Sequence, residues 1–243
     1  MYKCFCFALL CFITIGAQGK NSGLELENLL LRYFLEKSAD KVETRVGEPE
    51  AQANNGGDGG EDNNGIYQKK TLSSAIANSE VENQDFMDAM LYVHNHYRNL
   101  HCNTDALEHL QTLSDHAQTV ADDNAEAGEL EHSTTSYGEN LYRVQTHVYY
   151  GEFNQGILAL NAAKAWYGEQ TNYNYNNPGS SEGAIGHFTQ VVWKTTDQLG
   201  CAYNKVDGEN GYYTVYVTCN YSPTGNVYGE NGTNVDYRKP GVV

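Results

Sequence analysis

The stretch "GAIGHFTQVVWKTTDQLGCAY", Gly183 to Tyr203, places a histidine directly after a glycine and ahead of an apolar run. Its last residues begin a segment rich in Tyr and Val that continues to Tyr221. His187 can therefore be a packed core residue, a catalytic base or a metal ligand. The choice depends on which partners the rest of the chain supplies.

A β-hairpin is indicated directly after this stretch. "GCAYNKVDGENGYYTVYVTCNY", Gly200–Tyr221, has arms rich in Tyr and Val on both sides of the turn "DGENG". A turn at this position brings Cys201 and Cys219 within about one register step of direct opposition, so we expect a disulfide between them. Of the six cysteines, three lie in the first nineteen residues. We expect those three to be removed, which leaves Cys102 unpaired.

The N-terminal residues have the pattern of a secretory signal peptide. Lys3 precedes an apolar run that is too short to span a bilayer, and small residues follow it before Lys20. We expect residues 1–19 to be cleaved and the protein to be secreted into the extracellular space. A signal anchor that stays in the membrane is the alternative.

Residues 20–78 are predicted to form a leader with one short amphipathic helix and an acidic linker. The tract Asn54–Gly65 consists of Gly, Asn, Asp and Glu and has no apolar residue to bury. A folded domain is predicted over residues 79–230, followed by a tail at 231–243. The formal net charge of −16 argues against nucleic acid and anionic membranes as partners, because both require a basic surface.

Three segments of the domain have the apolar spacing of helices. The residues that share the first apolar face are Phe86, Ala89, Met90, Val93 and Tyr97. A second helix is predicted from about Leu110, with Gly128 placed to end it, and a third from about Gly156 to Gln170.

Four residues in separate segments are candidates for chemistry. Glu169 lies on the apolar face of the third predicted helix, where a carboxylate is costly unless a cation or a hydrogen-bond donor meets it. His132 and Glu139 are close in the loop sequence "HSTTSYGEN". With His187, these residues can hold a divalent ion, or the carboxylates can orient the imidazoles. General acid–base chemistry and a purely structural role remain open, because no segment has metal-ligand spacing such as HExxH.

Several motifs together resemble the CAP superfamily, which contains cysteine-rich secretory proteins, venom antigens and plant pathogenesis-related proteins. "GHFTQVVWKTTDQLGCAY" resembles its first signature and "YVTCNYSPTGNVYG" its second. "HSTTSYGENLY" resembles its histidine and GEN motif, "AWYGEQTNYNYNNPG" the stretch before the first signature, and "HNHYR" the opening helix. The resemblance covers about Asp85 to Gly229.

The resemblance implies an α/β fold, an α-β-α sandwich with a central antiparallel sheet and a large cleft. It also implies that His132, Glu139, Glu169 and His187 form the cavity tetrad of the family. In that reading the two histidines are the divalent-metal ligands, with weakly bound Zn²⁺ as the possible cofactor, and the two glutamates support them. We expect a single CAP domain, since no cysteine follows Cys219 and the cysteine-rich module that blocks ion channels is not recognised.

The resemblance favours a secreted, non-enzymatic protein that binds a lipid, a sterol or another extracellular ligand, and an extracellular protein partner is possible. A metal-assisted, protease-like hydrolase is one alternative, although the sequence offers no positioned Ser or Cys nucleophile. An extracellular effector or scaffold with a vestigial cleft is the other. The sequon "NGT" predicts a glycan on Asn231, whereas Asn220 is a poorer acceptor because Pro223 follows its sequon.

Overall fold

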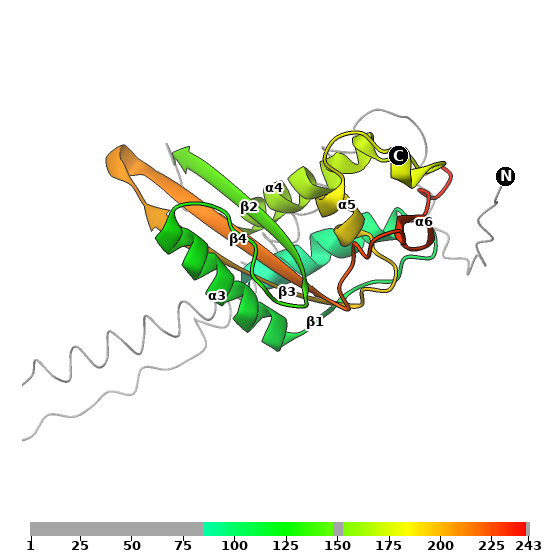
Figure 1. Ribbon diagram of the computed structural model, residues 1–243. Helices are drawn as coiled ribbons and strands as arrows, with labels where there is room; N and C mark the ends of the chain where they lie inside the picture. Colours follow the sequence, from blue (N-terminus) through cyan, green and yellow to red (C-terminus); the bar gives the residue numbers. More distant parts are fainter. Residues whose placement is uncertain (1–84, 148–152, 242–243) are drawn as a thin grey trace, which may run out of the picture. The chain divides into compact units, whose positions relative to one another are not determined.

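The computed structural model describes residues 85–147 and 153–241 (Figure 1). The predicted signal peptide, leader and linker lie outside these residues. The described chain forms, in order, a helix at residues 85–99, β1 (Glu108–His109), α3 (Gln111–Ala127), β2 (Gly138–His147), α4 (Gln155–Gly168), η1 (Glu169–Asn172), η2 (Pro178–Ser180), α5 (Gly186–Val191), β3 (Gln198–Asp207), η3 (Glu209–Gly211), β4 (Tyr212–Ser222) and α6 (Asn231–Asn234). Within this part of the chain, no helix is both long and apolar enough to cross a bilayer.

The four strands form one sheet in the order β1-β3-β4-β2. The three long strands are antiparallel, and β3 and β4 form the predicted hairpin. The two-residue strand β1 differs from the expected pattern because it pairs parallel to β3 at the sheet edge. The antiparallel part of the sheet carries all the strand residues that contribute to the site.

Helices cover both faces of this sheet, so the fold is an α-β-α sandwich (Figure 1). On one face α3 lies so close that a Cβ at Gly200 of β3 would collide with the backbone of Leu113 and Ser114. On the other face the 85–99 helix contacts β4, where His94 Nε2 lies 2.8 Å from the hydroxyl of Tyr221. Gly200 of β3 and Tyr221 of β4 therefore face opposite helical layers.

The helix predictions hold for the described residues. All five residues of the first predicted apolar face are buried. Gly128 caps α3 in the left-handed conformation, with φ 77°, which glycine adopts without steric cost. The third helix ends slightly earlier than predicted, and Glu169 stands at the point where α4 gives way to η1.

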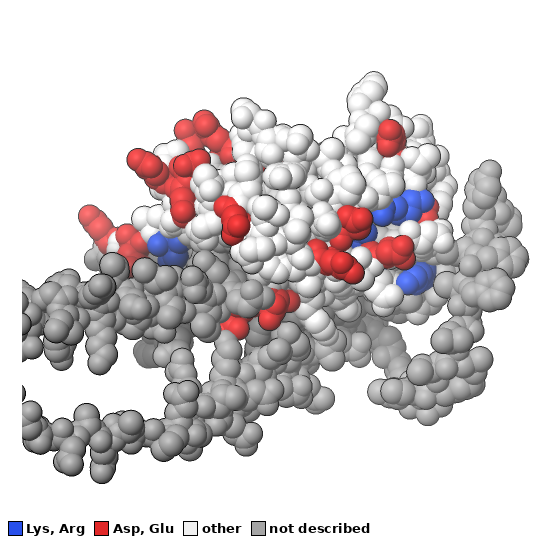
Figure 2. Space-filling model, turned by 90° about the horizontal axis from the view of Figure 1, so that it is seen from below, with Lys and Arg blue, Asp and Glu red and all other residues white. Residues whose placement is uncertain are grey.

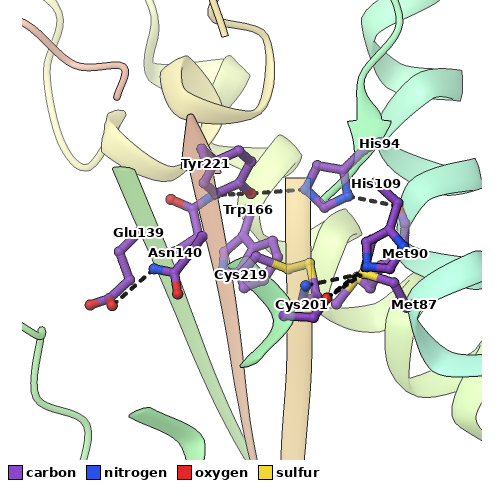
Figure 3. Close-up of a disulfide and its surroundings, with 12 residues drawn as sticks. Met87, Met90, His94, His109, Glu139, Asn140, Trp166, Cys201, Cys219 and Tyr221 are labelled. Carbon is purple, nitrogen blue, oxygen red and sulfur yellow. Dashed lines mark hydrogen bonds between the residues drawn. A yellow bond between two sulfur atoms is a disulfide. The ribbon is translucent and has the colours of Figure 1, made fainter. Parts of the chain in front are cut away.

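A disulfide joins Cys201 and Cys219, which are directly paired across β3 and β4 (Figure 3). The prediction that Cys102 stays unpaired is wrong, because Cys102 is disulfide-bonded. Its partner is neither of the other two described cysteines.

The segment after Gly229 packs onto the domain. Val235 is buried, and the backbone N–H of Cys102 donates to the carbonyl of Tyr237 at 2.9 Å. Lys239 N–H donates to Leu100 O at 2.8 Å. These bonds fix the last described residues against the end of the 85–99 helix.

Candidate functional site

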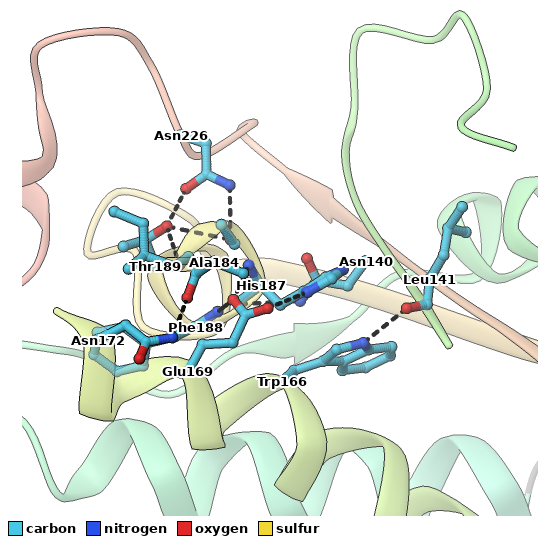
Figure 4. A network of polar contacts seen from close by, with 12 residues as sticks. Asn140, Leu141, Trp166, Glu169, Asn172, Ala184, His187, Phe188, Thr189 and Asn226 are labelled. Atoms are coloured by element: carbon cyan, nitrogen blue, oxygen red, sulfur yellow. Dashed lines mark hydrogen bonds and ion pairs between the residues drawn. The ribbon is translucent and has the colours of Figure 1, made fainter. Parts of the chain in front are cut away.

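Glu169 joins the end of α4 to the start of α5 (Figure 4). Its Oε2 accepts the backbone N–H groups of His187 at 2.8 Å and Phe188 at 3.3 Å, and its Oε1 lies 2.7 Å from His187 Nδ1. The first N–H groups of a helix have no partner inside the helix, and Ile185 at the N-cap supplies none from its side chain. The carboxylate therefore caps α5 and orients the imidazole at the same time.

Further hydrogen bonds fix α5 from two other segments. Asn226 donates through Nδ2 to Gly186 O at 2.9 Å and accepts from Thr189 Oγ1 at 2.6 Å. Asn140 of β2 donates to the backbone carbonyl of His187 at 3.1 Å. His187 consequently projects from a short helix whose first turn is held on several sides (Figure 4).

His132 and Glu139 form a second pair of the same kind. His132 Nδ1 lies 2.8 Å from Glu139 Oε1, which also accepts the backbone N–H of Ser133 at 3.0 Å. Glu139 Oε2 accepts from Ser133 Oγ at 2.7 Å and from Asn220 Nδ2 at 3.2 Å. The glutamate side chain is 6% exposed and that of the histidine 62%, so a buried carboxylate holds an imidazole that faces solvent.

The pKa of Glu139 reflects this environment. Burial alone would raise the pKa of the carboxyl group, but hydrogen bonds from Ser133, His132 and Asn220 outweigh it and lower the pKa below its ordinary value. Glu139 is thus a carboxylate at neutral pH and accepts a hydrogen bond from the N–H at His132 Nδ1.

The two pairs meet at the start of β2. Glu139 belongs to one pair, and its neighbour Asn140 bonds the carbonyl of His187 in the other. In the second pair, the side chains of His187 and Glu169 are 37% and 15% exposed. Each imidazole therefore has Nδ1 on a carboxylate, which leaves Nε2 as the nitrogen with a free lone pair.

A buried chain of hydrogen bonds supports this arrangement from the core (Figure 3). Asn140 also donates to the hydroxyl of Tyr221 at 3.1 Å. His94 Nδ1 donates to Met90 O at 2.8 Å, so its Nε2 accepts the Tyr221 O–H. Burial, the main cause, lowers the pKa of His94 from 6.5 to about 4, and the ring stays neutral.

Arg98 holds the other end of α5 from a fully buried position. Its guanidinium donates to the carbonyls of Val191 at 3.1 Å, Trp193 at 2.9 Å and Thr196 at 2.8 Å. It also donates to Asp105 O at 2.6 Å. The helix that carries His187 thus has a carboxylate at its N-terminal end and a cation at its C-terminal end, as the helix dipole favours.

The donor set determines what the site can bind. Within residues 85–147 and 153–241, no group of three or more His, Cys, Asp and Glu side chains is arranged to hold a metal ion. The two imidazoles nevertheless have the chemistry of metal ligands, because a carboxylate on Nδ1 fixes the tautomer whose Nε2 can coordinate. Two histidines fit a weak site that water must complete.

Sequence reasoning placed His132, Glu139, Glu169 and His187 in one site. The structure pairs His132 with Glu139 and His187 with Glu169, and a single site made of both pairs stays a prediction. Sequence reasoning missed the residues that hold them, which are Arg98, Asn140, Ser133, Asn220 and Asn226. Asn140 and Asn220 carried a signal, since an amide inside a strand needs a hydrogen-bond partner when it is buried. Arg98 carried a similar signal, because a guanidinium on a helix also needs hydrogen-bond partners when it is buried.

The comparison with protein families agrees with the motifs. The model of the cysteine-rich secretory protein family, CAP, matches residues 91–221. The chain belongs to this family. The match begins within the 85–99 helix and ends at the last residue of the CNY sequence, and it includes all four site residues.

Relatives come from fungi and other organisms. Protein PRY2 of Saccharomyces cerevisiae is 42% identical over 151 residues, which are 62% of this chain and 41% of that protein. The secreted protein RBT4 of Candida albicans is 38% identical over 151 residues, 62% of this chain and 38% of that protein. The CAP chain thus spans less than half of either relative. Among solved structures, the venom allergen-like protein 4 of Schistosoma mansoni aligns with a TM-score of 0.45 and 20% identity over 65% of this chain and 96% of that one.

The two sequons of the domain differ in accessibility. Asn220 is fully buried and its amide bonds Glu139, whereas Asn231 is partly exposed at the start of α6. Only Asn231 is therefore open to a glycosyl transferase once the domain is folded.

Proposed function

We propose that this CAP protein is secreted and works by binding, with a lipid, a sterol or another apolar extracellular molecule as its ligand and a divalent-metal-capable His/Glu site. The observation that carries the proposal is the pairing of both imidazoles with carboxylates through Nδ1. The name of RBT4, a secreted protein, supports the extracellular location. A glycan on Asn231 belongs to the same proposal.

The metal part of the proposal follows from the donor set. His132 and His187 would hold Zn²⁺ through Nε2, and Glu139 and Glu169 would support them from behind. When bound, the ion would supply a Lewis acid with water in its remaining positions. The residues themselves orient both imidazoles through Nδ1, whether or not a metal is present.

The apolar ligand is supported by side chains near the site in the sequence. Leu130, two residues before His132, is exposed. Val227 and Tyr228 are exposed directly after Asn226, the residue that clamps the start of α5. The face of the protein shown in Figure 2 carries many acidic and few basic side chains, and the formal net charge of the chain is −16. A neutral ligand such as a sterol suits a protein of this charge better than an anionic lipid headgroup does.

A hydrolase that activates water is the second candidate, since a carboxylate-oriented imidazole is also the arrangement of a general base. Against it, the hydroxyl of Ser133 donates a hydrogen bond to Glu139 Oε2 and not to an imidazole. The lowered pKa of Glu139 makes this carboxylate a poor base for activating the serine as a nucleophile.

The test is to express the full chain through a secretory pathway and to measure lipids and metals that co-purify with it by mass spectrometry. We expect a bound sterol or fatty acid, and Zn²⁺ below one equivalent. The control is His187→Ala, which should lose the metal and keep the lipid. Purified protein that carries no lipid, and takes up none from sterol or fatty-acid solutions, would contradict the ligand proposal.

A further inference from the structure

Asn220 links the buried carboxylate of the site to a third histidine. It is fully buried on β4, directly opposite Glu139 in the register with β2. Its Nδ2 donates to Glu139 Oε2 at 3.2 Å, and its Oδ1 lies 2.9 Å from Nδ1 of His116 on α3. The amide therefore connects α3 to the His132 half of the site through the sheet.

The chemistry of these groups sets the direction of each hydrogen bond. A carboxylate only accepts, so the NH₂ group of Asn220 must face Glu139. Its carbonyl oxygen then faces His116 and requires a donor, which makes Nδ1 of His116 the protonated ring nitrogen. A hydrogen-bond donor at His116 thus selects one orientation of the Asn220 amide. In this orientation Nδ2 of Asn220 occupies the remaining acceptor position of Glu139 Oε2.

The His132 half has more need of such support than the His187 half. His187 lies in a helix, and backbone N–H groups of that helix hold Glu169. His132 lies in a loop between α3 and β2, without regular secondary structure. His116 also contacts this loop directly, since its ring packs edge-on against Tyr137 with 5.4 Å between the ring centroids.

We propose that His116 and Asn220 are positioning residues, which hold Glu139 so that His132 keeps its proton on Nδ1 and presents Nε2 for binding. Neither residue touches the ligand. The consequence for Zn²⁺ rests on the proposed function, whereas the consequence for the His132 tautomer does not.

The test compares variants at position 116 by long-range ¹H–¹⁵N NMR of the metal-free protein at about pH 8, above the ordinary imidazole pKa of ~6.5. His116→Phe keeps a ring against Tyr137 but cannot donate to Asn220. His116→Asn places an NH₂ group where Nδ1 was, and should therefore keep the wild-type tautomer of His132. His96→Phe, on the 85–99 helix, is the matched control.

We expect wild type, His116→Asn and His96→Phe to show His132 protonated at Nδ1, and His116→Phe to shift toward the Nε2–H tautomer. Zn²⁺ affinity measured by calorimetry should fall about 10-fold in His116→Phe and in no other variant. This loss is at the lower end of the effect expected when a residue that supports a metal ligand is removed. Should that variant not fold, His116→Asp replaces it, because aspartate has the shape of asparagine and no donor.

An unchanged His132 tautomer in the donor-less variant would overturn the proposal. An equal change in His116→Asn or His96→Phe would do the same, because the effect would then not depend on the donor. A shifted tautomer in a protein whose wild type binds no Zn²⁺ supports the positioning role and contradicts only the metal part of the proposed function.

Discussion

Glu169 has two tasks at the scale of the single residue. One oxygen accepts two backbone N–H groups of α5, and the other accepts from His187 Nδ1. A carboxylate suits both tasks because it offers acceptor positions in several directions and no donor. The sequence places Glu169 on the apolar face of the third predicted helix, and donors from α5 explain why a carboxylate stands there.

Replacing Glu169 by Gln tests this double role. The amide keeps the size of the side chain, but its NH₂ group must face an N–H donor of α5 or of the ring. We expect a loss of about 1–3 kcal/mol in the free energy of unfolding, measured with urea. Glu182→Gln, at an exposed position between η2 and α5, should change it by less than about 0.5 kcal/mol. Equal stability of the two variants would show that Glu169 does not cap α5.

At the scale of the element, α5 is too short to be stable alone. It has six residues, and isolated helices need about 12–15. Its stability comes from buried side chains, from Glu169 at one end and from Arg98 at the other. The guanidinium is buried, and burial, as the main cause, lowers the pKa of Arg98 to about 10, so it remains charged at neutral pH.

Arg98→Lys should therefore be strongly destabilising. One ammonium group cannot reach the four carbonyls that the guanidinium bonds, so several buried carbonyls lose the hydrogen bond that Arg98 donates. We expect the melting temperature to fall by about 5–10 °C, from a loss of about 2–4 kcal/mol. Arg143→Lys on the exposed side of β2 is the control and should melt within about 2 °C of wild type. A similar small change for Arg98→Lys would mean that another group holds this end of α5.

The sequence predicted the elements better than their connections. Helical spacing and the Tyr- and Val-rich arms were sufficient for the helix faces and for the hairpin, because these patterns are local. The motifs also named the members of the two His–Glu pairs. The partners of Arg98 and Asn220 could not be predicted, since they come from segments far away in the chain. The pairing of Cys102 was missed because an odd number of expected cysteines was taken to leave one free.

At the scale of the whole molecule, two buried neutral histidines tie the stability of the fold to pH. Burial, the first cause in each case, lowers the pKa of His94 and of His101 from 6.5 to about 4. Below pH 6.5 the unfolded chain binds protons at these residues and the folded chain does not. Stability is therefore fully present above that pH and is lost as the pH falls toward 4.

We expect urea unfolding at pH 5 to show a loss of about 2 kcal/mol for each of these histidines relative to pH 7. The lowered pKa of Glu139 adds its own loss only at still lower pH, which keeps the two effects apart. His94→Gln should reduce the difference between the two pH values by about half. A wild-type protein equally stable at pH 7 and pH 5 would contradict the assignment of neutral, buried histidines.

The central claim is that two carboxylates orient two imidazoles through Nδ1, and we propose that both Nε2 atoms serve one metal position. The most direct measurement is an anomalous difference map from a crystal of the full chain soaked with Zn²⁺ at neutral pH. We predict one peak at about 2.0–2.1 Å from Nε2 of both His132 and His187, with both Nδ1 atoms still on Glu139 and Glu169. A peak on other residues, or coordination of Zn²⁺ through Nδ1 or through the carboxylates, would contradict this account.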